Sequence, residues 1–349
     1  MQYGAVRSVS EKGGCSVASH RVYLFFTLCL VACGLVLPGG FAGAAVPGKK
    51  VYITFADFSE RTGLVFVAKD QRFFEERGLE AEVVQVRSGP VAISALAAGD
   101  VQFYSAPASG ATIGAVTGGL DLVFIAGIIN KLDGYFVASP KIKTLSDVKG
   151  KTLGVQSIGG GIWMFTMMAL DHWGLNPERD KIQFRVIGDQ SVIAQAMTTG
   201  IIDGALLGYT FSKVVQRSGG QLLADLTKAN IPYQHQGLLA RKSFVDSSPD
   251  VAENTLRSLT KAIAFIQDPA NKRAVTRSLT KWLRLPPSEG AEDLYERMRM
   301  LYDRRIAPTK EGLQNALRVL GRINPKMAGL KAEDLMDDRI ARRLDAEGF

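Results

Sequence analysis

Two stretches of the chain repeat one order of apolar and polar segments at a constant offset of 101 residues. In residues 83–103 an apolar run, a polar loop, a helical repeat, a glycine and a second apolar run follow one another. Residues 184–204 have the same order without a gap. Gly99 and Gly200 close the two helical repeats, as glycine does in a left-handed helix-terminating turn. The pattern predicts two similar halves.

The parallel extends upstream in both halves. Val51–Phe55 and Thr152–Gln156 are apolar strand-type runs, and a loop and a helical stretch follow each of them. The helical stretches stop at Gly78-Leu79 and at Gly174-Leu175. Strands that alternate with helices form a parallel sheet with helices on both faces. We therefore predict an α/β protein with two doubly wound lobes.

The boundaries of the lobes follow from the same pattern. The strand Leu120–Gly127 and the segment Tyr135–Ser139 are expected to cross from the first lobe to the second, and Gly237–Ala240 to begin the return. The expected division is a signal peptide in 1–44, the first lobe in 45–136, the second lobe in 137–236, and a return to the first lobe with C-terminal helices in 237–349.

The last third of the chain is helical and amphipathic. Ser248-Pro249 supplies a cap and a first-turn proline for a helix that extends to Ile266. Apolar periodicity predicts further helices near 272–283, 288–304 and 309–322. We expect these helices to pack on the first lobe.

The N-terminus has the pattern of an export signal. A basic stretch precedes the uncharged run Val22–Leu37, and a small-residue cleavage site ends at Ala44. This apolar run is shorter than the ~20 residues that a membrane-spanning helix needs. We predict cleavage after Ala44 and a periplasmic protein; an uncleaved N-terminal anchor is the alternative.

The cysteines allow a second form of export. Leu30–Cys33 resembles a lipoprotein signal, in which Cys33 would carry the lipid. All three cysteines (Cys15, Cys29 and Cys33) precede the predicted cleavage site. The mature chain would then have neither a disulfide nor a cysteine nucleophile, which suits an oxidising compartment.

Composition and charge give little indication of catalysis or nucleic-acid binding. The formal net charge is +8 for the whole chain, and it falls to about +6 without residues 1–44. The basic residues are dispersed among acids, so we expect no nucleic-acid partner. His172 and His235 stand alone, and no HExxH, GxSxG or Cys/His metal spacing occurs. We predict no enzyme, no catalytic residue, no metal and no cofactor.

The loops between strands and helices are the expected ligand site. Ligands of open parallel sheets bind beyond the carboxyl ends of the strands, where helix N-termini offer free N–H groups to anions. Gly159-Gly160-Gly161, ahead of an apolar helix, is the most suggestive of these loops, because close approach of a ligand would justify three glycines. Arg61, Arg87 and Lys131 could supply positive charge for an anionic ligand, or be solvated surface cations. Candidate aromatic walls are Phe58, Tyr104, Trp163, Phe165 and Tyr209.

Four segments together resemble a known family. They are Phe73–Glu80, Ala95–Phe103, Leu145–Val155 and Gly200–Ala205, in this order along the chain. The sequence resembles the substrate-binding proteins of ABC importers of the nitrate/sulfonate/taurine type, including the NMT1/THI5-like group. The resemblance covers roughly residues 50–265.

The resemblance implies a type II periplasmic-binding-protein fold, with a ligand cleft between two lobes joined by two crossover strands. The ligand-contacting loops of the family map onto Phe58, Ser59, Arg61, Arg87, Ser88, Gly89, Ser105, Asn130, Ser157, Gly159, Gly160, Asp189, Gln190 and Tyr209. Arg87-Ser88-Gly89 stands where family members often have a glycine pair, so the ligand's identity does not transfer. Asp189 could repel an anion or bind an amine, which leaves the sign of the ligand's charge open.

The resemblance also implies a function. The chain is expected to be an extracytoplasmic solute-binding component of an ABC importer, closing by a hinge on a small sulfonate-like, carboxylate-like or heteroaromatic solute. Its expected partners are the solute and a membrane permease with its ATPase, and we expect a monomer. The alternatives are a solute-binding sensory partner of a membrane receptor, and an enzyme on the same fold of the pyrimidine synthase or menaquinone-pathway lyase type.

Overall fold

The computed structural model describes residues 48–285 and 291–348. The predicted signal peptide, its cleavage site and Cys33 lie outside these residues. Within the described part, no helix combines the length and the apolar character needed to span a membrane.

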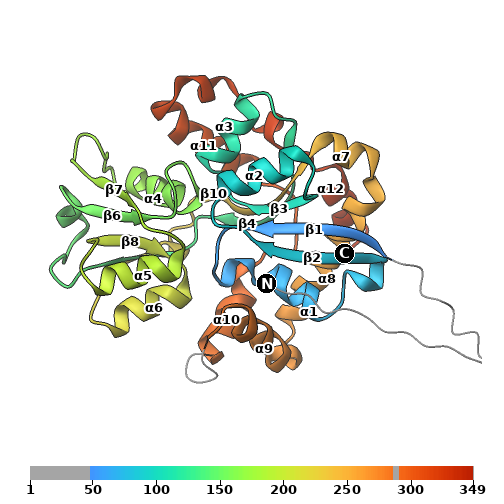
Figure 1. Ribbon diagram of the computed structural model, residues 1–349, viewed down its shortest axis with the longest axis horizontal. Coiled ribbons are helices and arrows are strands. Elements are labelled where there is room, and N and C mark those ends of the chain that lie inside the picture. Colours follow the sequence, from blue (N-terminus) through green and yellow to red (C-terminus); the bar gives the residue numbers. More distant parts are fainter. Residues whose placement is uncertain (1–47, 286–290, 349) are drawn as a thin grey trace, which may run out of the picture. The chain divides into compact units, whose positions relative to one another are not determined.

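The first lobe is built on a five-stranded sheet of order β2-β1-β3-β10-β4. Its strands are β1 (Lys49–Phe55), β2 (Leu79–Gln85), β3 (Phe103–Ala106), β4 (Leu122–Lys131) and β10 (Pro232–Arg241). β1 pairs in parallel with β2 and β3, whereas β10 is antiparallel to β3 and β4. Helices α1 (Gly63–Asp70), α2 (Gly89–Ala98) and α3 (Gly110–Thr117) connect the first four strands. Figure 1 shows α2 and α3 on one face of the sheet and α1 on the other.

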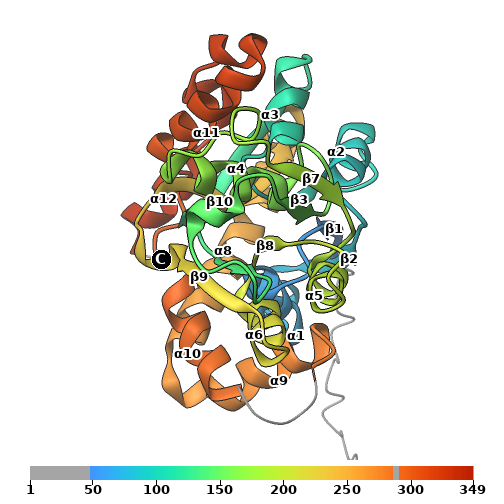
Figure 2. The ribbon, with the colours of Figure 1, turned by 90° about the vertical axis from the view of Figure 1, so that its left-hand side faces the viewer.

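The second lobe repeats this plan around a sheet of order β7-β6-β8-β5-β9. Its strands are β5 (Tyr135–Ala138), β6 (Thr152–Val155), β7 (Gln183–Val186), β8 (Gly204–Leu207) and β9 (Gln221–Asp225). Its helices are α4 (Gly161–His172), α5 (Gln190–Thr198) and α6 (Tyr209–Arg217). Figure 2 views the molecule from the side of this lobe. The two sheets with flanking helices confirm the predicted fold class.

The internal repeat is confirmed element by element. At the offset of 101 residues, α2 corresponds to α5 and β3 to β8. Gly99 and Gly200 both have positive φ angles, of 86° and 73°, directly after these helices. The repeat therefore reflects two copies of one helix-strand arrangement.

Two short segments join the lobes. The first, Leu132–Gly134, lies between β4 and β5, and the second leads from β9 through the 3-10 helix Leu226–Lys228 into β10. β10 begins at Pro232, upstream of the apolar segment Gly237–Ala240 in which the sequence pattern placed the return. The first half of β10 is mostly polar and therefore lacks the apolar pattern of a buried strand. It is nevertheless buried where the lobes meet.

The first helix is shorter than its pattern indicated. α1 ends at Asp70, Arg72 takes a positive φ of 61°, and a 3-10 turn, Glu75–Arg77, leads to Gly78. The break turns Phe73 and Phe74 into the core, where both are buried. Burial of two aromatic rings outweighs the cost of one left-handed residue.

The C-terminal helices pack mainly on the first lobe, as expected. They are α7 (Lys242–Ser247), α8 (Pro249–Gln267), α9 (Lys272–Trp282), α10 (Ala291–Leu301), α11 (Lys310–Ile323) and α12 (Arg339–Ala346). Phe66 of α1 stacks on Trp282 of α9 with ring centroids 4.7 Å apart. The predicted helix 288–304 is confirmed over 291–301 and in part lies outside the described residues. α11 runs beside α4 of the second lobe (Figure 1) and contacts it.

Candidate functional site

The carboxyl ends of the parallel strands of both sheets meet at one place, which we call the lobe junction. The first lobe contributes the loop Asp57–Arg61 after β1, and the second contributes the loops after β6, β7 and β8. The loop Asp57–Arg61 is held by its own side chains, since Ser59 Oγ donates to Asp57 Oδ2 at 2.8 Å and accepts from Arg61 N. This capped turn carries three charged side chains toward the second lobe.

Arg61 is the centre of a buried ion-pair cluster. Its Nε donates to Asp133 Oδ2 at 3.0 Å, its Nη1 to Asp57 Oδ2 at 3.3 Å, and its Nη2 to the carbonyl oxygen of Asp133 at 3.1 Å. The guanidinium carbon lies 5.4 Å from the centre of the Phe165 ring in the second lobe. Asp133 belongs to the first crossover segment, so Arg61 ties the β1 loop to that segment rather than standing free for an anion.

A second guanidinium reaches the same carboxylate. Arg297 of α10 forms an ion pair with Asp133 Oδ1, and its guanidinium lies 5.9 Å from the centre of the Tyr135 ring. Burial lowers the pKa of Arg297. Asp133 thus joins the first crossover segment to both the β1 loop and the C-terminal helices.

His235 of β10 completes the cluster, just beyond the second crossover segment. Its Nδ1 accepts a hydrogen bond from the backbone N–H of Asp133 at 3.0 Å, and its ring stacks on Phe165 at 3.8 Å. Burial, and then the charge of Arg61, hold the pKa of His235 well below its usual range. The ring is therefore neutral, with its proton on Nε2, an atom that is buried and has no hydrogen-bond partner.

Glu60 connects the first lobe to the N-terminus of α6. Its Oε1 accepts from the backbone N–H of Tyr209 at 2.6 Å, and its Oε2 accepts from Thr210 Oγ1 at 2.9 Å and from Thr210 N at 3.4 Å. The Glu60 side chain is fully buried. A carboxylate at a helix N-terminus is stabilised by the free N–H groups and the helix dipole. One lobe thereby caps a helix of the other.

Two glutamines make the neutral contacts across the junction. Gln190 Nε2 donates to Asp57 Oδ1, and Gln190 Oε1 accepts from Gly208 N at 2.6 Å. Gln156 Nε2 donates to the carbonyl oxygens of Ala56 and Arg87, both at 2.9 Å. The second lobe therefore presents amides to the carboxylate and carbonyl oxygens of the first.

The glycine triplet lies against the first lobe. Gly159 has a φ of 75°, and its carbonyl oxygen accepts from Ala111 N at 2.8 Å. A Cβ on Gly161 would approach Pro107 Cγ to 3.0 Å. Small residues are required here because the backbones of the two lobes come close together.

Aromatic side chains line the same boundary. Phe58 and Phe211 face each other across the lobes with ring centroids 6.3 Å apart. Tyr209 contacts Tyr135 edge-on at 5.8 Å and donates its hydroxyl to Asp293 Oδ2 at 3.2 Å. Partial burial, and then the charge of Asp293, raise the pKa of Tyr209 to about 12.

Other predicted residues have local roles. Asp189 caps its own helix, α5, through Ser191 N at 2.9 Å. Asn130 contacts the C-terminal segment, with its Nδ2 3.4 Å from the Ala307 carbonyl oxygen. Ser105 Oγ accepts from Gln236 Nε2 at 2.5 Å.

The remaining predicted residues flank the junction. Arg87 is exposed, and Ser88 precedes α2 without a side-chain capping bond. Gly89 is buried next to the Tyr104 hydroxyl. Ser157 Oγ is buried and lacks a hydrogen-bond partner. A Cβ on Gly160 would clash with this hydroxyl.

Sequence reasoning missed most of the charged cluster. Asp57 and Glu60 flank residues that were predicted, but nothing in their spacing indicates that they reach another lobe. Asp133 and Arg297 are far apart in sequence and meet only through folding. The consecutive polar residues Gln234, His235 and Gln236, followed at once by an apolar strand, were the available signal for a buried polar strand.

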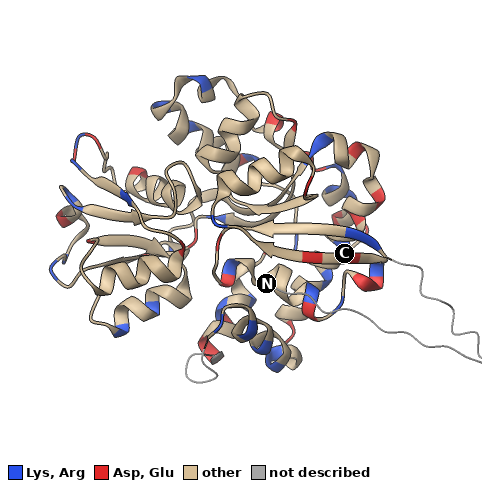
Figure 3. Ribbon diagram, viewed as in Figure 1, with Lys and Arg blue, Asp and Glu red and all other residues tan. Residues whose placement is uncertain are grey.

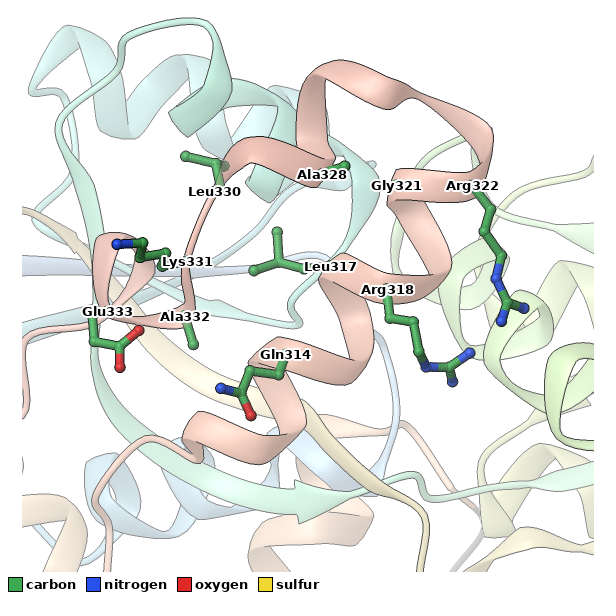
Figure 4. Close-up of a pocket in the computed structure, with 10 residues that line it drawn as sticks. All are labelled: Gln314, Leu317, Arg318, Gly321, Arg322, Ala328, Leu330, Lys331, Ala332 and Glu333. Carbon is green, nitrogen blue, oxygen red and sulfur yellow. The ribbon is translucent and has the colours of Figure 1, made fainter.

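Two cavities lie away from this junction. One of about 600 Å³ lies along α11 and is lined by Leu317, Leu330 and Lys331 among others (Figure 4). Arg318 and Arg322 leave α11 on the side away from Lys331, and both form ion pairs with Asp171 of α4. The other cavity, of about 330 Å³, lies at the end of α8. None of the predicted site residues lines either cavity.

Surface charge and metal-ligand geometry do not mark another site in the described part of the chain. Basic and acidic residues are interspersed over the helices of both lobes (Figure 3). Among residues 48–285 and 291–348, no group of three or more His, Cys, Asp or Glu side chains could hold a metal ion.

A known family matches more than half of the chain. The family model described as NMT1/THI5 like matches residues 60–272. A protein of Brucella abortus (strain 2308), provisionally named a binding protein, is 28% identical over 250 residues, which are 70% of this chain and 74% of that protein.

Solved structures share the fold at low sequence identity. A protein from Bordetella bronchiseptica RB50 superposes with a TM-score of 0.73 at 20% identity, over 86% of this chain and 98% of that one. The alkanesulfonate-binding protein SsuA from Xanthomonas axonopodis pv. citri gives 0.65 at 17% identity, over 82% and 96%. The periplasmic nitrate-binding protein NrtA from Synechocystis PCC 6803 gives 0.67 at 14% identity, over 86% and 89%. These likenesses establish a periplasmic-binding-protein fold.

Proposed function

From the premise that this chain belongs to the NMT1/THI5-like family, we propose that it is the extracytoplasmic solute-binding component of an ABC importer. It binds a small solute at the lobe junction and delivers it to a membrane permease that is driven by a cytoplasmic ATPase. The names of the fold neighbours support this assignment, since they include a sulfonate-binding and a nitrate-binding protein. The protein works as a monomer in the periplasm after removal of residues 1–44.

One observation carries the proposal: the carboxylate of Glu60 in the first lobe caps α6 in the second. This contact, and that of Gln190 with Asp57, can exist only while the lobes are together. Both contacts come from loops beyond the carboxyl ends of strands, where α/β proteins bind ligands. Asp133 lies in the first crossover segment that would bend, and it is bonded to His235, which lies in β10 just beyond the second.

The mechanism that we propose is hinge closure. The lobes exchange between open and closed arrangements, and a solute that contacts both stabilises the closed one. A ligand shifts this equilibrium only by its difference in affinity for the two states. The hydrogen bonds of Glu60 and Gln190 supply part of the closing free energy, so that the solute needs to supply only the remainder.

A ligand screen by thermal unfolding tests the proposal. A solute at 100 times its Kd should add about 2.7 kcal/mol to the free energy of unfolding. The same solute should lower the radius of gyration in small-angle X-ray scattering, because it favours closure. Solutes that co-purify with the protein can be identified by mass spectrometry. A protein that retains no solute, and that no member of a broad screen stabilises, would contradict the proposal.

A further inference from the structure

We infer that the solute is a cation that donates N–H hydrogen bonds, such as an amine or an amidinium, and is not an oxyanion. This inference rests on the proposed solute-binding function and names the chemical class of its ligand. It follows from the net charge of the buried side chains at the lobe junction, from the pairing of both guanidiniums with carboxylates, and from acceptors there that can still receive a hydrogen bond.

The buried charges at the junction favour a positively charged solute. Among the described residues, the buried carboxylates and guanidiniums are Asp57, Glu60, Arg61, Asp133, Asp180 and Arg297. Asp180 lies in the second lobe and pairs with Arg179 at 2.6 Å. The other five lie at the junction, three carboxylates against two guanidiniums, which gives a net charge of −1. An added oxyanion would increase this buried negative charge, whereas a cation would balance it.

Both guanidiniums are paired with carboxylates, although Nε of Arg297 has no hydrogen-bond partner. Three of the five N–H donors of Arg61 point to Asp57 and Asp133. Arg297 is ion-paired with Asp133. An oxyanion would have to compete with carboxylates for both, which costs the stability of buried ion pairs.

Helix N-termini are the other usual anion sites; side chains of the protein cap those of α3, α5 and α6, whereas α2 and α4 have no side-chain cap. Glu60 occupies the N-terminus of α6, and Asp189 occupies that of α5 with its Oδ1 3.3 Å from Val192 N. In the first lobe, Ser109 Oγ accepts from Thr112 N at the start of α3. Two of the three helix N-termini of the second lobe therefore carry a negative charge before any ligand arrives.

Two acceptor atoms at the junction can still receive a hydrogen bond, which favours a ligand with N–H donors. Gln236 is fully buried, its Oε1 has no hydrogen-bond partner, and its Nε2 is bonded to Ser105. Ser105 pairs with Phe55 at the end of β1, two residues before Asp57, so this acceptor belongs to the same edge of the sheet. Asp57 Oδ1 accepts from the amide of Gln190, and its second lone pair can accept from a ligand N–H. A buried acceptor without a partner costs about 1–3 kcal/mol, which a donor would recover.

The aromatic rings and the unpartnered donors at the junction suit a planar or alkyl cation that also carries one hydrogen-bond acceptor. Phe58, next to Asp57, faces Phe211 across the junction, and aromatic faces attract cations. His235 Nε2 and Arg297 Nε are buried donors without partners. These two donors can bind a neutral oxygen or ring nitrogen of the same solute.

Isosteric probes of opposite charge test the inference. Benzamidine and benzoate are the matched pair, with nearly the same shape and opposite charge. Agmatine, an alkyl dication, and ethanesulfonate, an alkyl anion, extend the test to flexible solutes of different length. For the protein expressed from the full chain, benzamidine or agmatine at saturating concentration should raise Tm by at least about 3 °C. Benzoate and ethanesulfonate should leave Tm unchanged. Co-purified solutes should appear as cations in mass spectrometry.

Three variants assign the effect to the junction. Asp57→Asn and Glu60→Gln keep the size of the side chain and remove its charge, and each should weaken binding of the cation about 10- to 100-fold. Glu60→Gln should also raise the affinity for benzoate relative to benzamidine. Asp246→Asn makes the same change of charge on the first lobe, where Asp246 pairs with Lys242 and Arg339, and it should leave affinity unchanged. Tm of each variant without ligand reports its folding.

The outcomes separate this inference from the function on which it rests. Binding of an anion, with no cation bound, would overturn the charge assignment and leave the solute-binding function intact. Binding of a cation with equal affinity by the parent and by both junction variants would overturn the assignment to Asp57 and Glu60. If no cationic probe binds, the inference fails. The function fails as well only if no solute co-purifies and no member of the broad screen stabilises the protein.

Discussion

The two lobes share one sequence of strands and helices, but they bring different chemistry to their common boundary. The first lobe presents ionised side chains, Asp57, Glu60 and Arg61, on the loop after its first strand. The second lobe contributes amide donors, from the side chain of Gln190 and from the backbone at the start of α6. Charge on one side and neutral donors on the other allow the lobes to close without bringing like charges together.

The β1 loop and its counterpart in the second lobe illustrate this division. After β1 the chain makes a turn in which Ser59 bonds Asp57 and Arg61. After β6 the chain has the glycine triplet, and Gly159 offers only its backbone to Ala111. An internal repeat therefore conserves the scaffold while its loops diverge, because loops do not carry the core packing.

The largest expected effect is the loss of Arg61. Arg61→Met keeps much of the volume but leaves Asp57 and Asp133 buried without their main partner, so we expect a loss of about 3–5 kcal/mol in the free energy of unfolding. Urea denaturation measures this loss. Arg185→Met is the control in the second lobe, where Arg185 is exposed and bonds the Ile201 carbonyl, and it should cost less than about 0.5 kcal/mol. A cost below 1 kcal/mol for Arg61→Met would contradict the ion-pair cluster.

Glu60 caps a helix of the other lobe, whereas Asp189 caps a helix of its own lobe, so variants of the two can be compared. Glu60→Ala should cost about 1.5–3 kcal/mol and shift the lobes toward the open arrangement, because it removes charge-assisted hydrogen bonds that only the closed form makes. Asp189→Ala removes a local cap and should cost about 1 kcal/mol without any change in lobe separation. Denaturation gives the energies, and small-angle scattering gives the separation. Equal scattering from the two variants would mean that Glu60 does not hold the lobes together.

His235 makes the junction sensitive to pH. Its pKa in the folded protein lies well below the ordinary value of 6.5, so below pH 6.5 the unfolded chain binds more protons than the folded one. The free energy of unfolding should therefore fall as pH drops from 6.5, by up to about 1.4 kcal/mol per pH unit from this residue. His235→Gln should flatten the profile between pH 7 and 5.5, whereas replacing the exposed His172 by Gln should not. An unchanged slope in His235→Gln would show that another group titrates.

The smallest effect concerns the ion pairs between α11 and α4. Asp171 accepts from Arg318 at 2.8 Å and from Arg322 at 2.5 Å, and all three side chains are partly exposed. Asp171→Asn should cost less than about 1 kcal/mol, and the difference should vanish at 1 M salt. A larger cost that persists in salt would indicate that this contact, and not the junction alone, controls the lobes.

The sequence by itself determined the scaffold. Periodicity, the glycines after helices and the repeat at an offset of 101 residues led to two lobes of strands and helices, because local patterns encode which faces are buried. It also placed the loop of Phe58, Ser59 and Arg61, the glycine triplet and Tyr209 at strand ends, and the structure brings these together at one junction.

Only the tertiary structure decided what these residues contact. Arg61 could be a free cation by sequence, but folding brings Asp133 to it from the first crossover, and Arg297 of α10 pairs with the same carboxylate. The polar start of β10 lacks an apolar pattern because the buried side chains of Gln234, His235 and Gln236 find hydrogen-bond partners in other segments of the chain. Charge pairing and buried hydrogen bonds depend on groups that are distant along the chain, and no local periodicity records them.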